Sequence, residues 1–94
     1  MKKHERLLAG ETIISREPGN SMTPKINHRQ PVRLAPTTWR EVEVGDIVYC
    51  KVRGRFYTHL VGGKCNQRGC KIQNNRGHVN GWTKKVFGKV IEVL

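Results

Sequence analysis

The sequence predicts one small domain, residues 1–94, that is built mainly from β-strands. Short stretches rich in Val and Ile alternate with Gly, Pro and Asn, which is typical of strands separated by turns. No stretch of ten residues keeps the 3.6-residue periodicity of an amphipathic helix. With 94 residues, of which 36% are hydrophobic, the chain can bury a single thin core. We expect residues 1–10, which hold few apolar side chains, to be flexible.

The first half of the chain gives weaker strand signals than the second half. Residues 11–15 are the first expected strand, and the Pro and Gly that follow end it. Residues 21–28 contain a proline and are expected to form one helical turn. Residues 31–34 form a short strand, with Val32 and Leu34 on one face.

A hairpin in the middle of the chain is the clearest local prediction. Residues 47–52 alternate so that Val48, Cys50 and Val52 share a face. The Arg-Gly pair at 53–54 is a two-residue turn signal, so we expect 55–61 to be the partner strand.

The last third of the chain predicts a second hairpin and a final strand. Residues 64–73 form the hairpin, and residues 74–81, rich in Asn and Gly, are expected to be a polar loop. Residues 86–93 form the last strand. Gly88 interrupts this strand and indicates a bulge or a close approach of another part of the backbone.

The segment with the most chemical information reads Gly-Asn-Ser-Met-Thr-Pro at 19–24. A serine in a turn before a short helical piece can present its hydroxyl at the surface. Backbone N–H groups at such a turn, around Asn20 and Met22, suit the stabilisation of an oxyanion. Taken alone, Ser21 fits equally well as a turn or N-cap residue.

This motif resembles the nucleophile motif, Gly-x-Ser-Met-x-Pro, of signal peptidases and LexA-like self-cleaving peptidases. In that family a hydrophobic strand follows, as at 31–34, and then a Val-Gly-Asp-Ile-Val element, as at 44–48. A polar loop rich in Asn or Asp and a Gly-Lys-Val strand come last, matched here by 74–75 and 87–91.

The resemblance covers residues 11–93, and it implies both a fold and an activity. The implied fold is the LexA and signal-peptidase catalytic core, a coiled and partly closed antiparallel sheet. The implied activity is that of a serine endopeptidase cleaving an extended peptide, with Ser21 as its nucleophile. A compact protein of this kind suits a phage or a mobile element.

The base in the matching strand is His59, where bacterial signal peptidases and LexA-like enzymes have lysine. A histidine here resembles the archaeal and endoplasmic-reticulum signal peptidases, whose catalytic dyad is Ser and His. A neutral imidazole, with a reference pKa near 6.5, can accept the serine proton around neutral pH. The alternative is a buried strand histidine that is satisfied by a backbone carbonyl.

Histidine-dependent relatives usually carry an acidic residue in the late polar loop to orient the imidazole. Residues 73–82 contain no Asp or Glu, so Asn75 or Asn80 is the candidate orienter. An amide cannot stabilise an imidazolium as a carboxylate does, and this substitution predicts slow or lost activity.

The formal net charge of +11 supports a different hypothesis. A catalytically inactive peptidase-like module could bind a protein or nucleic-acid partner through its basic surface. A third reading, a zinc site, would combine Cys50, Cys65 and Cys70 with His59 or His78. Because three is an odd number of cysteines and no secretory signal precedes them, we expect free thiols, no metal and no cofactor.

Membrane and compartment expectations follow from the distribution of apolar residues. No stretch approaches the roughly 20 consecutive apolar residues that cross a bilayer. The N-terminus lacks the apolar centre of a secretory signal. We therefore expect no membrane span and a cytoplasmic location.

Overall fold

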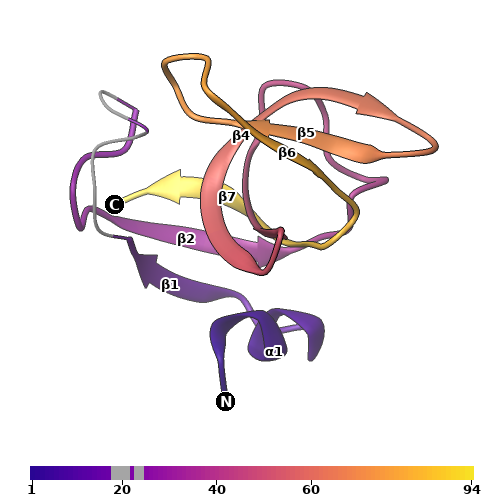
Figure 1. Cartoon of the computed structure of the whole chain (residues 1–94). Coiled ribbons are helices and arrows are strands. Elements are labelled where there is room, and N and C mark those ends of the chain that lie inside the picture. The colour runs from indigo at the N-terminus through magenta and orange to yellow at the C-terminus, as the bar shows by residue number, and fades with distance from the viewer. Residues whose placement is uncertain (18–21, 23–24) are drawn as a thin grey trace.

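A computed structural model describes residues 1–17, 22 and 25–94 of the chain (Figure 1). Its elements, in chain order, are α1 (Lys3–Leu8), β1 (Ile13–Arg16), β2 (Pro31–Pro36), β3 (Ile47–Val52), β4 (Arg55–Cys65), β5 (Gly69–Gln73), β6 (Val79–Thr83) and β7 (Val86–Val93). The predicted mainly-β character is confirmed.

The seven strands form one antiparallel sheet in the order β1-β2-β7-β3-β4-β5-β6. β1 and β6 are therefore its two edges. Figure 1 shows that the sheet is strongly curved, with α1 and β1 on one side of the molecule and β5 and β6 on the other. β7, the last strand of the chain, lies in the middle of the sheet between β2 and β3.

The predicted central hairpin is confirmed, with β3 at the expected residues. Arg53 and Gly54 both have positive φ, 51° and 82°, which is the conformation of a tight type I′ turn. The turn sets the register Val52↔Arg55 between β3 and β4. β4 continues to Cys65, four residues further than expected, because after a register shift it pairs with β5 as far as the tip of the second hairpin.

The prediction of a polar loop over 74–81 is wrong in its second half, because Val79–Thr83 forms the edge strand β6. The turn itself is short. Asn74 closes it by accepting hydrogen bonds through Oδ1 from the backbone N–H groups of Arg76 and His78, at 2.9 and 3.0 Å. Gly81, with φ of 144°, interrupts the apolar alternation that would have marked β6 in the sequence.

The sequence analysis did not anticipate the helix α1 within residues 1–10. Its Leu7 is 2% exposed and lies over Gly88, where an added Cβ would be only 2.9 Å from Leu7 Cδ1. The nearest neighbour of Gly88 is thus a side chain and not the backbone, while the register shift between β3 and β7 beside it agrees with the bulge predicted as the alternative. Nowhere in residues 1–17, 22 and 25–94 is there a helix with the length and apolar character that a bilayer crossing requires.

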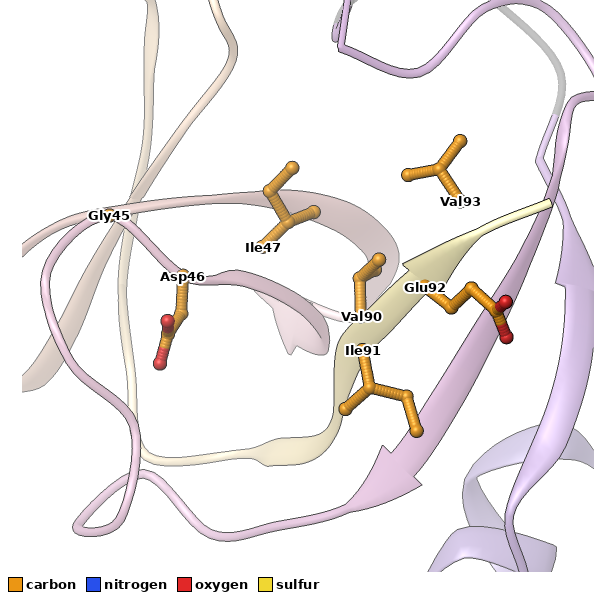
Figure 2. A pocket seen from close by; sticks show the side chains of 7 residues that line it. All are labelled: Gly45, Asp46, Ile47, Val90, Ile91, Glu92 and Val93. Carbon is orange, nitrogen blue, oxygen red and sulfur yellow. The ribbon is translucent and has the colours of Figure 1, made fainter.

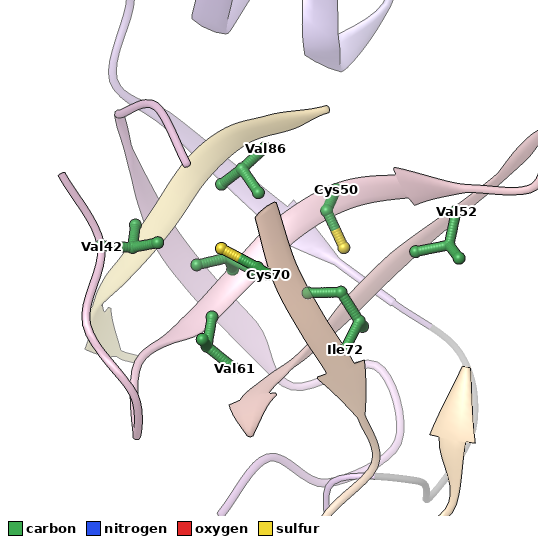
Figure 3. Packing of buried hydrophobic residues seen from close by; sticks show 8 residues of the cluster. Val42, Cys50, Val52, Val61, Cys70, Ile72 and Val86 are labelled. Carbon is green, nitrogen blue, oxygen red and sulfur yellow. The ribbon is translucent and has the colours of Figure 1, made fainter. Parts of the chain in front are cut away.

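Two hydrophobic clusters fill the molecule, one on each face of the central strands. The first cluster (Figure 3) consists of Val42, Val48, Cys50, Val52, Val61, Cys70, Ile72 and Val86. The second cluster consists of Leu7, Ile13, Met22, Ile26, Val32, Leu34 and Tyr49, with Ile47, Leu60, Phe87 and Val90 packed against it. Strand alternation divides β3 and β4 between them.

Candidate functional site

His59 lies in the middle of β4 and is only 8% exposed. It is paired with Val48 of β3. Alternation along β4 places its side chain on the face of Val61, which belongs to the first cluster, while Leu60 packs against the second cluster. A buried, titratable ring therefore lies on the face of the sheet that carries the first cluster.

Asn80 of β6 contacts this ring directly. His59 Nδ1 and Asn80 Oδ1 are 2.7 Å apart. The contact depends on a β-bulge: Ile72 pairs with Gly81 and Gln73 pairs with Val79, so Asn80 is the extra residue of β6. A bulge re-aims a side chain relative to regular alternation, and here the bulged residue is the one that meets His59.

The hydrogen bond fixes which nitrogen of the ring carries the proton. An amide oxygen only accepts, so Nδ1–H donates to Asn80 and, in the neutral ring, Nε2 keeps a lone pair. Burial lowers the pKa of His59 below its ordinary value of 6.5; the hydrogen bond that His59 donates to Asn80 opposes this shift, and the nearby His78 adds to it. The ring is consequently neutral at pH 7, with Nε2 able to accept a proton.

Tyr57 and a cavity adjoin the same ring. The ring centroids of Tyr57 and His59 are 5.0 Å apart, with 34° between their planes. A cavity of about 360 Å³ lies beside them, between the β3–β4 turn and β6. We call it the arginine cavity, and it is lined by Val52, Arg53, Arg55, Tyr57, His78, Val79 and Asn80.

Tyr57 and the two arginines are not among the site residues that the sequence motifs predict. The alternation of the expected strand over 55–61 already places Tyr57 on the same face as His59, two residues away. The signal for a shared site was therefore available for Tyr57. The sequence gives no such signal for Arg53 and Arg55, since exposed arginines at a hairpin turn are common.

A second cavity of about 310 Å³ lies between the start of β3 and the end of β7 (Figure 2). We call it the acidic cavity, and its lining residues are Gly45, Asp46, Ile47, Val90, Ile91, Glu92 and Val93. The carboxylates of Asp46 and Glu92 point in different directions in Figure 2 and do not converge on one point.

Ser21 and Asn20 lie outside the described residues, so their predicted roles remain predictions. Met22 is described: its side chain is 3% exposed in the second cluster. Its carbonyl accepts a hydrogen bond from the N–H of Ile26 at 2.9 Å. Leu60, the neighbour of His59, packs against the same cluster.

Of the two candidate orienters, Asn80 is the one whose contact with His59 is described. Asn75 lies in the turn between β5 and β6. Its proposed role stays a prediction.

The three cysteines are free thiols, and two of them, Cys50 and Cys70, lie in the first cluster. Burial raises the pKa of Cys50 to about 12, with a further contribution from Cys70, and burial also raises the pKa of Cys70. Cys65 stands at the end of β4, where its Sγ accepts the N–H of Arg68 at 3.3 Å. Within the described ranges, no three His, Cys, Asp or Glu side chains gather as metal ligands would.

Comparisons with protein-family models, with curated proteins and with solved structures gave no match to this chain. Its function is therefore inferred from the geometry around His59 and from the sequence motif.

Proposed function

We propose that this chain is a serine endopeptidase with the LexA and signal-peptidase type of catalytic core, in which Ser21 is the nucleophile and His59 the general base. The contact between His59 Nδ1 and Asn80 Oδ1, at 2.7 Å, carries the proposal. The general base of a serine peptidase must be a neutral imidazole that is held in one orientation with Nε2 as the basic nitrogen, and this contact favours that orientation.

The proposed reaction is acyl transfer to Ser21 followed by hydrolysis. The Ser21 hydroxyl attacks the carbonyl carbon of the scissile peptide while His59 Nε2 takes its proton. The C–N bond then breaks, and the departing amine receives that proton. A water molecule repeats the sequence on the acyl-enzyme, again through Nε2, which releases the acid and restores Ser21.

The described neighbours of the two residues show which cluster each segment contacts. Met22, which follows Ser21, is buried in the second cluster, and Leu60, which follows His59, packs against that cluster, whereas alternation turns the side chain of His59 to the opposite face of β4. The curved antiparallel sheet is also consistent with the proposed core type. Its edge strands, β1 and β6, offer backbone groups along which an extended peptide substrate could pair.

The first experiment measures cleavage of a fluorogenic library of extended peptides by the purified chain. We expect Ser21→Ala and His59→Ala each to reduce the rate at least about 100-fold, because each removes a group that acts in the chemical step. Thermal unfolding of each variant checks that the fold is intact. His4→Ala, in α1, is the matched histidine control and should cleave at the wild-type rate. If His59→Ala cleaved the peptides at the wild-type rate, the proposal would be contradicted.

The second experiment tests Asn80 as a positioning residue. Asn80→Ala should lower kcat about tenfold or more, because the imidazole loses its orienting acceptor. Asn80→Asp should raise the pKa of His59, since a carboxylate favours the charged ring, and should shift the acidic limb of the rate profile to higher pH. An unshifted limb in Asn80→Asp would show that this contact does not act on the base.

A second candidate function is supported by the distribution of charge. The basic span, residues 47–91, contains no Asp or Glu, and its Lys and Arg residues are Lys51, Arg53, Arg55, Lys64, Arg68, Lys71, Arg76, Lys84, Lys85 and Lys89. An inactive peptidase-like module could bind a polyanionic partner through this surface. That function predicts binding that weakens steeply with salt and is indifferent to Ser21→Ala, together with no cleavage by the wild-type chain.

A further inference from the structure

The arginine cavity joins a strongly positive region to the ring of His59. Two of its residues, Tyr57 and Asn80, are also contacts of His59, at 5.0 Å between ring centroids and 2.7 Å between Oδ1 and Nδ1. A group bound in the cavity is therefore separated from the proposed general base by a single side chain.

The positive charge of this cavity is not neutralised by protein carboxylates. In the described part of the chain the ion pairs are Lys3–Glu17, Arg6–Glu11, Arg33–Glu92 and Lys89–Asp46. None of them includes Arg53 or Arg55, and the basic span that surrounds these arginines has no acidic residue. The guanidinium groups are thus left for an external anion.

The side chain of Arg53 lies near Gly81, the residue next to Asn80. Arg53 occupies the left-handed region, φ 51°, at a turn position where Asn or Gly is the usual choice. A Cβ added at Gly81 would lie 3.7 Å from Arg53 Nε, which is an ordinary contact distance, and 3.0 Å from Val52 Cγ1. The guanidinium end of Arg53 therefore lies beside the strand residue that follows Asn80, the hydrogen-bond partner of His59.

We infer that the arginine cavity binds the carboxylate of an Asp or Glu side chain that flanks the scissile bond of the substrate. This inference rests on the proposed peptidase function and adds a substrate class to it. Guanidinium groups pair with carboxylates through two parallel hydrogen bonds, and Tyr57 and His78 add further donors. Val52 and Val79 supply apolar surface for the methylene groups of the side chain.

A peptide suits the cavity better than a nucleic acid does. Single-stranded nucleic acid is bound along an open groove where bases stack on aromatic rings. The arginine cavity, of about 360 Å³, has two valines in its wall, and its phenol ring, that of Tyr57, already contacts the ring of His59.

The test uses two peptides that differ only by Glu or Gln next to the scissile bond. Cleavage is measured with the wild-type chain, and binding is measured by fluorescence polarisation with Ser21→Ala. We expect the Glu peptide to be favoured about tenfold in both assays, at low salt, and this preference to disappear in Arg53→Gln/Arg55→Gln. The control Lys84→Gln/Lys85→Gln removes the same charge from the exposed β6–β7 turn and should keep the preference.

The outcomes separate the two proposals. Cleavage with equal rates for both peptides overturns the acidic subsite and leaves the peptidase standing. Selective binding of the Glu peptide without any cleavage overturns the peptidase and keeps the cavity as a carboxylate site. If a single-stranded oligonucleotide binds more tightly than the Glu peptide and depends on Arg53 and Arg55, the subsite is overturned in favour of nucleic acid.

Discussion

The arginine cavity and the acidic cavity are nearly equal in volume, about 360 and 310 Å³, yet they differ in every property that bears on binding. The charges of the acidic cavity are already paired, Asp46 with Lys89 at 3.5 Å and Glu92 with Arg33 at 2.9 Å. Arg53 and Arg55 take part in no such pair within the described residues. Only the arginine cavity adjoins a buried titratable ring. Unpaired charge beside such a ring identifies a candidate site here, whereas volume does not.

The largest expected difference between the two regions is in how much an isoleucine near each cavity contributes to the free energy of unfolding. Ile72 of β5, paired with Gly81 next to the arginine cavity, is fully buried in the first cluster, and Ile91 of the acidic cavity is 53% exposed. Ile72→Ala should lower the free energy of unfolding by about 2–5 kcal/mol, because it leaves a void in the core. Ile91→Ala should change it by less than about 0.5 kcal/mol. Urea unfolding of both variants measures this, and equal losses would contradict the difference.

A smaller difference is expected at the glycine beside each cavity. Gly81 and Gly45 both have positive φ, 144° and 102°. An added Cβ at Gly81 would meet Val52 Cγ1 at 3.0 Å, while at Gly45 it would meet nothing within 4 Å. Both alanine variants carry backbone strain of about 1 kcal/mol or more, and Gly81→Ala should lose about 1 kcal/mol beyond Gly45→Ala through crowding. The denaturant midpoints of Gly81→Ala and Gly45→Ala measure this difference. Identical midpoints would mean that the Val52 side chain moves away from the added Cβ without loss of folding free energy.

The dependence of stability on pH should come partly from the His59 side of the molecule. Because burial lowers the pKa of His59 below 6.5, the unfolded chain binds its proton more readily than the folded chain. The contribution of His59 to stability is therefore complete above pH 6.5 and is lost as the pH falls toward the lowered pKa, by at most about 1.4 kcal/mol per pH unit. His59→Gln should lack this loss when unfolding is compared between pH 5 and 8. If the wild-type chain instead became more stable relative to His59→Gln as the pH falls, the pKa of His59 would be raised in the folded state and the prediction would be wrong.

The smallest effect concerns Thr58, which precedes His59 in β4. Its Oγ1 is buried and has no hydrogen-bond partner among the described residues. Thr58→Val keeps the shape and removes the unsatisfied hydroxyl, so the variant should be more stable by about 1 kcal/mol. Thermal unfolding measures the gain, with cleavage as a check that the neighbouring base is undisturbed. A destabilised Thr58→Val would mean that the hydroxyl is hydrated.

The parts of the fold that sequence predicts well are those with strong local signals. β3 and β7 have the predicted bounds. Apolar alternation and the Arg-Gly turn mark β3, while a run rich in Val and Ile marks β7. β6 was missed, since Asn80 and Gly81 break its alternation and its pairing is completed only by β5. The helix α1 was missed as well. Its six residues are stabilised by tertiary packing of Leu7 on Gly88, a contact far from local in the sequence.

The candidate site also has residues that the sequence predicts and residues that it does not. Sequence could nominate His59 as the base and Asn75 or Asn80 as its orienter, from residue type and order. It could not choose between the two asparagines, since the contact of Asn80 depends on one bulged residue in a strand that was read as a loop. Arg53 and Arg55 could not be predicted as cavity residues, because the cavity exists only where the β3–β4 turn and β6 meet.

The basic span gives the molecule a permanent electric dipole. Residues 1–46 hold eight Lys and Arg against six Asp and Glu, whereas residues 47–91 hold ten Lys and Arg and no acid. β5 and β6, which belong to the basic span, lie on the side of the molecule away from α1 (Figure 1). On glass, a cation-exchange resin or another anionic support at low ionic strength, the protein should adsorb in one orientation, with β5 and β6 against the surface and α1 turned outward. An immobilised sample would then have its arginine cavity covered, while the same protein free in solution would not.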